Sequence, residues 1–165
     1  MWYKEGYKWV SVHKEEGRTM RLSYYHASLW CPVTYRPGCW VQPRLDNGPL
    51  GVFAELSCAL EFHSVCTPGV ELWRIHYIPA TTTIEYLESV DPTDPIDPTD
   101  PISAGYLFWE VHPKTREIHG MRLGEIAPGS ILAAAVRLVK QVTLEELFEG
   151  GLARAALYDA AMAAS

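Results

Sequence analysis

The stretch VELWRIHYI, residues 70–78, decides the fold predicted for this chain. Its side chains alternate between two faces, which is the two-residue period of a β-strand. One face carries Val70, Leu72, Arg74, His76 and Ile78, and the other carries Glu71, Trp73, Ile75 and Tyr77. We predict a central strand in which Trp73 and Ile75 are more buried than Arg74 and His76.

Two β-hairpins are predicted on either side of this strand. Residues 7–13 read YKWVSVH and alternate, so Lys8 shares one strand face with two valines. The turn KEEG follows, and the alternating residues 18–26 then pair with the first strand. The second hairpin is predicted from residues 105–111 and 116–123, which flank the turn HPKT.

The turn-rich residues 35–49 lie between the first hairpin and a short apolar run, LGVF at residues 50–53. Proline, glycine and asparagine cluster there, and these residues favour tight turns. The apolar run predicts a buried strand, and apolar residues at helical spacing from Leu56 predict a helix after it.

The C-terminal part predicts one further strand and then helices. Residues 128–142 combine an alanine run, which favours a helix, with VRLVKQV, which favours a strand, and we predict a strand from Ala135. Thr143 and Glu146 have the spacing of a capping box at a helix start. The predicted class is therefore α+β, a mainly antiparallel sheet with one inserted helix and C-terminal helices. We divide the chain into a domain of residues 1–142 and a helical segment of residues 143–165.

Charge and hydropathy exclude several classes of partner. The net charge of −6 is concentrated in residues 91–100 and 143–165, and the sequence holds no basic run. A duplex nucleic acid partner is therefore disfavoured. No apolar run approaches the roughly 18 residues of a membrane span, so no membrane association is predicted. The polar N-terminus lacks the pattern of a signal peptide, which predicts a cytoplasmic protein.

The acidic repeat DPTDPIDPTDPI, residues 91–102, is predicted to be a stiff, extended loop within the domain. Each proline fixes its own φ and keeps the preceding residue out of the helical region. We consider two interpretations, a tolerated surface insertion and an acidic arm that binds a partner. The arm would act through its four aspartates, Asp91, Asp94, Asp97 and Asp100.

The four cysteines do not show the close spacing of a zinc knuckle. Cys31 and Cys39, like Cys58 and Cys66, are separated by seven residues, whereas zinc sites favour two to four. Free thiols, disulfides and a mixed site that includes His63 are all compatible with the sequence. We predict no metal site.

A first family resemblance rests on turn and core residues. The pattern runs from Tyr35-x-Pro-Gly38 through Gly48-Pro-Leu-x-Val-Phe53 and a helix with Ala59 and Phe62 to APGSILAAAVRLVKQV, residues 127–142. It resembles small uncharacterised proteins of phages and their bacterial hosts, over residues 7–80 and 126–142. This resemblance implies a shared fold and an origin in a phage or a related mobile element.

A second resemblance suggests an enzyme. SYYHAS at residues 23–28, followed by LGVFAELSCALEF at 50–62, resembles the start of an ADP-ribosyltransferase core. The resemblance implies NAD as cofactor, with His26 at the nicotinamide ribose and Phe53 stacked near nicotinamide. The acid would be Glu85 or Glu110. Ala27 stands where that family has glycine, and Phe53 lacks the hydroxyl of the family pattern.

Two hypotheses for function follow. The first is a non-enzymatic binding or assembly protein without a cofactor, either a virion component or a binder of a host factor in the host cytoplasm. Its contacts would be Tyr35, Arg36 and Trp40, because exposed Trp and Arg are frequent at binding hot spots, together with the four aspartates of the acidic repeat. A protein partner is expected, and self-association is a further option. The alternative is the ADP-ribosyltransferase-like, NAD-dependent enzyme.

Overall fold

The computed structural model shows a mainly antiparallel β-protein built around a closed barrel, with nearly half of the described residues in strands and a much smaller share in helices. It describes residues 2–24, 30, 32–44, 46–64, 67–81, 99–149 and 162–164. Its strands are β1 (Lys4–Glu15), β2 (Arg18–Ser23), β3 (Thr34–Tyr35), β4 (Trp40–Val41), β5 (Leu50–Phe53), β6 (Val70–Pro79), β7 (Tyr106–Val111), β8 (Ile118–Arg122) and β9 (Ser130–Gln141).

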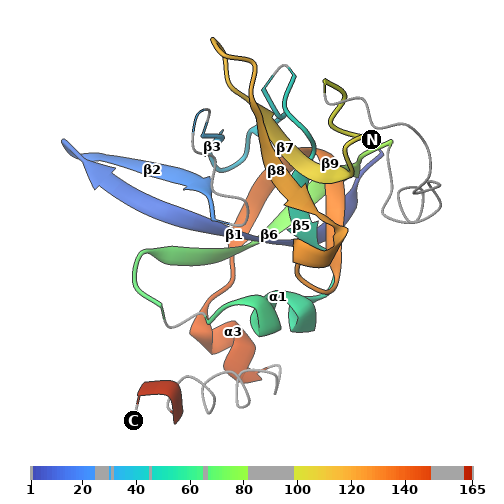
Figure 1. Cartoon of the computed structure of the whole chain (residues 1–165). Helices are drawn as coiled ribbons and strands as arrows, with labels where there is room; N and C mark the ends of the chain where they lie inside the picture. Colours follow the sequence, from blue (N-terminus) through green and yellow to red (C-terminus); the bar gives the residue numbers. More distant parts are fainter. Residues whose placement is uncertain are drawn as a thin grey trace.

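The barrel is a ring of four strands in the order β1–β5–β9–β6. Strand β6 pairs with β1 along one edge and with β9 along the other, and β5 bridges the remaining edges of β1 and β9. The closing pair joins Tyr7 of β1 to Phe53 of β5. In Figure 1, β1 and β2 extend from this ring as a long blue hairpin, which confirms the predicted N-terminal hairpin.

Strand β6 has the central position that its sequence predicts. Trp73 is 8% exposed and Ile75 is buried, whereas Arg74 is exposed and His76 is partly exposed. This part of the prediction is confirmed. Leu72, on the face assigned to Arg74 and His76, is also buried, because that face of β6 is covered at its N-terminal end.

The predicted α+β class with C-terminal helices is wrong. The error begins at the alanine run, because β9 starts at Ser130 and not at Ala135. Ala133 and Ala135 are buried where β9 pairs with β6, and their small side chains fit the crowded wall of a narrow barrel. The alanines thus serve strand packing, and the longer strand closes the ring that the sequence pattern does not show.

Two apolar clusters lie on the two sides of the barrel wall. The inner cluster includes Val10, Val52, Ile75, Val136 and Leu138. The outer cluster is centred on Trp9, Phe53, Ala59, Leu72 and Phe108. Both faces of the central strands are therefore buried, and each face contributes to stability through the apolar area removed from water.

The described helices are short. Helix α1 (Leu56–Phe62) packs on the outer cluster, where the indole Nε1 of Trp9 donates to the carbonyl of Ala59 at 2.7 Å. The other helices are η1 (Leu123–Glu125) and α3 (Leu144–Glu149).

The first predicted C-terminal helix is confirmed, and half of its capping box forms. The hydroxyl of Thr143 accepts from the backbone N–H of Glu146 at 3.3 Å, as a helix N-cap does. The second predicted C-terminal helix, residues 152–164, lies mostly outside the described residues, which resume at 162–164. None of the helices in the described part of the chain is long and apolar enough to cross a membrane.

A separate two-stranded sheet, β7–β8, confirms the second predicted hairpin. Three residues of the turn before β5 attach it to the barrel. The backbone N–H of Gly48 donates to the carbonyl of Trp109 at 2.8 Å, and the side-chain oxygen of Asn47 accepts from the N–H of Val111 at 3.0 Å. The carbonyl of Asp46 accepts from the indole Nε1 of Trp109 at 2.9 Å, so backbone and side-chain hydrogen bonds join residues 46–48 to β7.

Candidate functional site

A row of side chains crosses three neighbouring strands on the outer surface of the barrel. Trp40 of β4 lies opposite Arg137 of β9, and Arg137 lies opposite His76 of β6. Arg137 points outward because its neighbours in β9, Val136 and Leu138, point into the barrel. The backbone register therefore places a tryptophan, an arginine and a histidine side by side.

Tyr3 completes this row, which we call the aromatic–arginine face (Tyr3, Trp40, His76 and Arg137). The rings of Tyr3 and His76 stack with centroids 4.1 Å apart and planes 22° apart. The guanidinium of Arg137 lies 4.9 Å from the ring centroid of Trp40 and 5.8 Å from that of Tyr3, within cation–π range. Arg137 also donates to Nδ1 of His76 at 2.6 Å.

These contacts hold the arginine in place without an acidic partner within the face. A guanidinium fixed between aromatic rings loses little further freedom when it binds a carboxylate, and it keeps donors for a bidentate contact. Tyr3 is 39% exposed, so the face is open to solvent at its aromatic side. The arrangement suits an anionic, partly apolar partner.

A shallow pocket of about 310 Å³ continues from His76 along the surface. Arg74 and Tyr7 line it, and the guanidinium of Arg74 lies 5.8 Å from the ring of Tyr7. Arg74 also pairs with Glu146 at 3.6 Å, and Lys140 pairs with the same carboxylate at 2.9 Å. Hydrogen bonding to Lys140 lowers the pKa of Glu146, so this carboxylate stays charged and is shared by two cations.

The structure separates the three predicted contact residues of the turn-rich segment. Trp40 belongs to the aromatic–arginine face, and Arg36 is exposed at the neighbouring turn. Tyr35 is 2% exposed and packs in the inner cluster, so it cannot contact a partner. Burial raises the pKa of its hydroxyl above its usual range. Nothing in the residues around Tyr35 indicates that it ends a strand and points inward.

The residues implied by the ADP-ribosyltransferase resemblance are not brought together among the described residues. Phe53 is 1% exposed and packs against Phe62 with centroids 5.5 Å apart, so its ring cannot stack on a nicotinamide. Glu110 is buried on β7, where its carboxylate accepts from the N–H of Trp30 at 3.3 Å. His26 and Glu85 lie outside the described residues.

Within the acidic repeat, only residues 99–102 are described, so the predicted contacts Asp91, Asp94 and Asp97 lie outside the described residues. Asp100 is exposed, and its carboxylate accepts from the N–H of Ile102 at 3.1 Å. This local bond turns the chain toward β7, as aspartate commonly does in loops.

Lys8 is a buried amine whose burial is not evident from its local sequence. It is 0% exposed inside the barrel, its Nζ donates to the carbonyl of Gly51 at 2.7 Å, and the ring centroid of Tyr35 lies 5.3 Å away. Burial lowers its pKa to about 7 because an apolar interior disfavours the ammonium form. The one feature of the sequence that could have indicated this burial was the position of Lys8 on the same strand face as Val10.

Replacing Gly48 by alanine is expected to destabilise the protein by about 1–3 kcal/mol, the usual cost of overpacking. The added Cβ would lie 2.6 Å from two ring atoms of Trp109, whose indole Nε1 is held by the carbonyl of Asp46 at 2.9 Å. Urea unfolding of the two proteins measures the difference. Gly124→Ala is the matched control, because a Cβ there has nothing within 4 Å. Equal stability of both variants would contradict the packing described here.

The described cysteines and acidic or histidine side chains do not form a metal site. Cys39 is exposed and Cys58 is partly exposed, and both are free thiols. No group of three or more His, Cys, Asp or Glu side chains is placed to hold a metal ion within the described ranges. Cys31 and Cys66, which the sequence left open to a disulfide or a mixed site, lie outside these ranges.

The aromatic–arginine face combines solvent exposure, a fixed geometry and a positive charge. Comparison of the chain with family models, with curated proteins and with solved structures finds no match.

Proposed function

We propose that this chain is a non-enzymatic binding or assembly protein whose contact surface is the aromatic–arginine face. The observation that carries the proposal is the cross-strand row of Trp40, Arg137 and His76, with Tyr3 stacked on its end. Tryptophan, tyrosine and arginine are the residues most enriched at binding hot spots. An origin in a phage or mobile element, and a place in the host cytoplasm or the virion, remain proposals based on the sequence pattern.

The chemistry of the face favours an acidic, extended partner segment that contains proline. Arg137 supplies positive charge beside His76, and Arg74, which pairs with Glu146, lines the pocket that continues from His76. Aromatic rings that present a flat face are the common docking sites for proline-rich segments, which lose little entropy on binding. The protein's own acidic repeat, residues 91–102, has this composition, so a second copy of the chain is one such partner.

The enzyme alternative gains no support from the described residues. The buried ring of Phe53 and the core position of Glu110 leave the transferase resemblance without an accessible site in this part of the chain. The experiments below therefore test binding and not NAD-dependent catalysis.

A synthetic peptide of residues 91–102 tests the proposal with a defined probe. We expect the full-length protein to bind it, and we expect binding to weaken as salt is added, because the attraction is largely between exposed charges. Arg137→Gln is expected to weaken binding about tenfold, since it removes both the charge and the cation–π contacts. Isothermal titration calorimetry measures these affinities.

Arg18→Gln is the matched control, because it removes the same charge from the exposed end of the β1–β2 hairpin. A Trp40→Ala variant tests the aromatic part of the face separately. Absence of peptide binding, or equal losses in Arg137→Gln and Arg18→Gln, would refute the proposed use of this face. Sedimentation of the full-length protein then shows whether the same contact joins two copies.

A further inference from the structure

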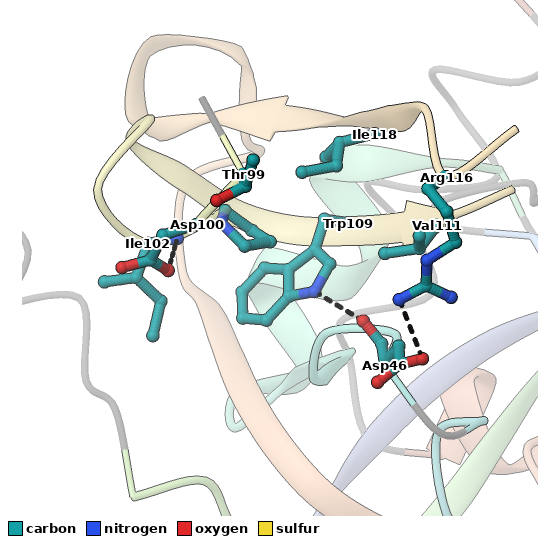
Figure 2. Close-up of a pocket in the computed structure, with 9 residues that line it drawn as sticks. Asp46, Thr99, Asp100, Ile102, Trp109, Val111, Arg116 and Ile118 are labelled. Atoms are coloured by element: carbon teal, nitrogen blue, oxygen red, sulfur yellow. Dashed lines mark hydrogen bonds and ion pairs between the residues drawn. The ribbon is translucent and has the colours of Figure 1, made fainter. Parts of the chain in front are cut away.

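A second hollow, about 480 Å³ in volume, lies on the β7–β8 hairpin, away from the residues of the aromatic–arginine face. We call it the Trp109 pocket. Figure 2 shows the indole of Trp109 at its centre, with Asp100 and Ile102 on one side and Val111 and Arg116 on the other. Its full lining is Asp46, Thr99, Asp100, Pro101, Ile102, Trp109, Val111, Arg116 and Ile118.

The indole of Trp109 is fixed as a flat wall of this pocket. Its Nε1 donates to the carbonyl of Asp46 at 2.9 Å, and its own backbone carbonyl accepts from Gly48 at 2.8 Å. Gly48 also covers one face of the ring, at a distance that leaves no room for a Cβ. The ring also lines the pocket (Figure 2).

The charges around this wall are predominantly negative. Asp46 is paired with Arg116 at 3.1 Å, so these two charges offset each other. Asp100 uses one oxygen to accept from the N–H of Ile102, and no cation contacts it among the described residues. Asp100, which none of the ion pairs among the described residues neutralises, therefore lines the same pocket as the indole of Trp109.

The remaining walls are apolar and come from Ile102, Val111 and Ile118. An aromatic face attracts a cation through its quadrupole, and a nearby carboxylate adds Coulomb attraction. Aliphatic walls accept the carbon atoms attached to the cation. An anion would meet Asp100 without a free positive charge, because Arg116 is already paired.

We propose that the Trp109 pocket binds an alkylammonium group. Trp109 provides the cation–π contact, Asp100 provides the counter-charge, and the aliphatic walls hold the alkyl carbons. The ligand is either a free amine or a lysine side chain of another protein, and both present the same chemistry to the pocket. This site is independent of the aromatic–arginine face, so it stands or fails separately from the proposed function.

Choline, which carries a quaternary ammonium, is the first probe, and its uncharged carbon isostere 3,3-dimethylbutan-1-ol is the matched ligand control. We expect choline to bind the full-length protein with a dissociation constant of about a millimolar, as is ordinary for a ligand of this size. The isostere is expected to bind more weakly by about three- to tenfold. Nuclear magnetic resonance titration measures both and identifies the indole N–H that shifts.

Asp100→Asn is the decisive variant, because asparagine can still accept from Ile102 while the charge is lost. We expect it to weaken choline binding by about three- to tenfold. Glu15→Gln, an exposed carboxylate at the end of the β1–β2 hairpin, is the protein control and should leave binding unchanged. Trp109→Phe should also weaken binding, and its unfolding curve reports separately on any loss of fold.

A pair of short peptides, one with lysine and one with norleucine at the same place, separates the two sources of the ligand. Preference for the lysine peptide over free amines supports a partner protein, and the reverse supports a small metabolite-like amine. Equal binding of choline and its uncharged isostere, or unchanged binding in Asp100→Asn, would overturn the proposal. So would the absence of binding by every cation tested.

Discussion

Replacing Trp73 by alanine is expected to lower the free energy of unfolding by about 3–5 kcal/mol. The indole is buried in the inner cluster, and its Nε1 donates to the carboxylate of Glu71 at 3.0 Å. Arg21 pairs with the same carboxylate at 2.8 Å, and its guanidinium lies 5.4 Å from the indole ring. Truncation therefore leaves a cavity, and it removes the contacts that the indole makes with Glu71 and Arg21.

The position of β6 makes this loss difficult to relieve. Both edges of the strand are hydrogen-bonded, to β1 and to β9, so the backbone cannot shift to fill the space. Chemical denaturation measures the effect. Arg74→Ala is the matched control on the same strand, because Arg74 is exposed and its loss should cost less than about 1 kcal/mol. Equal losses in both variants would mean that the indole is not part of the core.

The free energy of unfolding is also expected to rise as the pH is raised from about 7 to about 10.5, the folded and the ordinary pKa of Lys8. Between these values the unfolded chain binds a proton that the folded protein has released, so protons favour unfolding. This stabilisation is fully present above the pKa of Lys8 in the unfolded chain, and it is lost as the pH falls to the pKa of Lys8 in the folded protein. At about 1.4 kcal/mol per pKa unit, the change amounts to several kcal/mol.

A Lys8→Met variant isolates this contribution, because methionine fills similar space and does not titrate. We expect the wild-type protein to gain stability relative to the variant as the pH rises from neutral to about 10, the ordinary pKa of tyrosine. Above that pH the unfolded chain releases the Tyr35 proton while the folded protein keeps it, because burial raises the pKa of this hydroxyl. Tyr35 therefore lowers the free energy of unfolding of both proteins as the pH rises further. Parallel curves of stability against pH would show that Lys8 is not desolvated in the folded state.

Local patterns were sufficient for most individual strands. The alternation at residues 7–13 and 70–78 predicted β1 and β6, and the turn HPKT predicted the β7–β8 hairpin. Each of these depends on side chains a few residues apart, which a sequence displays directly. The burial of Trp73 and Ile75 followed from the same alternation.

Closure of the barrel was not predictable in this way, because it depends on pairing between distant segments. The bridge made by β5 rests on contacts of Phe53 with Tyr7 and with Ser130. Nothing local to these residues marks them as neighbours. Without that closure, the strand at the alanine run was predicted to start only at Ala135, and the predicted C-terminal helices were given too much weight in the class.

The candidate site shows the same limit. Trp40 was chosen from its own segment as an exposed aromatic residue, and the structure places it in the face. His76 and Arg137 join it only through the registers of β4, β6 and β9, which the sequence does not specify. Lys8 was visible as a charge on an apolar strand face, but its complete burial required the closed ring.

The ring of strands also has a consequence for the order in which the protein matures. Strand β9 bonds to both β5 and β6, so the barrel cannot close until residues up to 141 have left the ribosome. The β1–β2 hairpin can form early, whereas the apolar inner sides of β5 and β6 stay exposed until β9 pairs with both strands. Such non-local pairing is slow, typically milliseconds to seconds. During that interval the apolar inner sides of both strands are exposed to solvent.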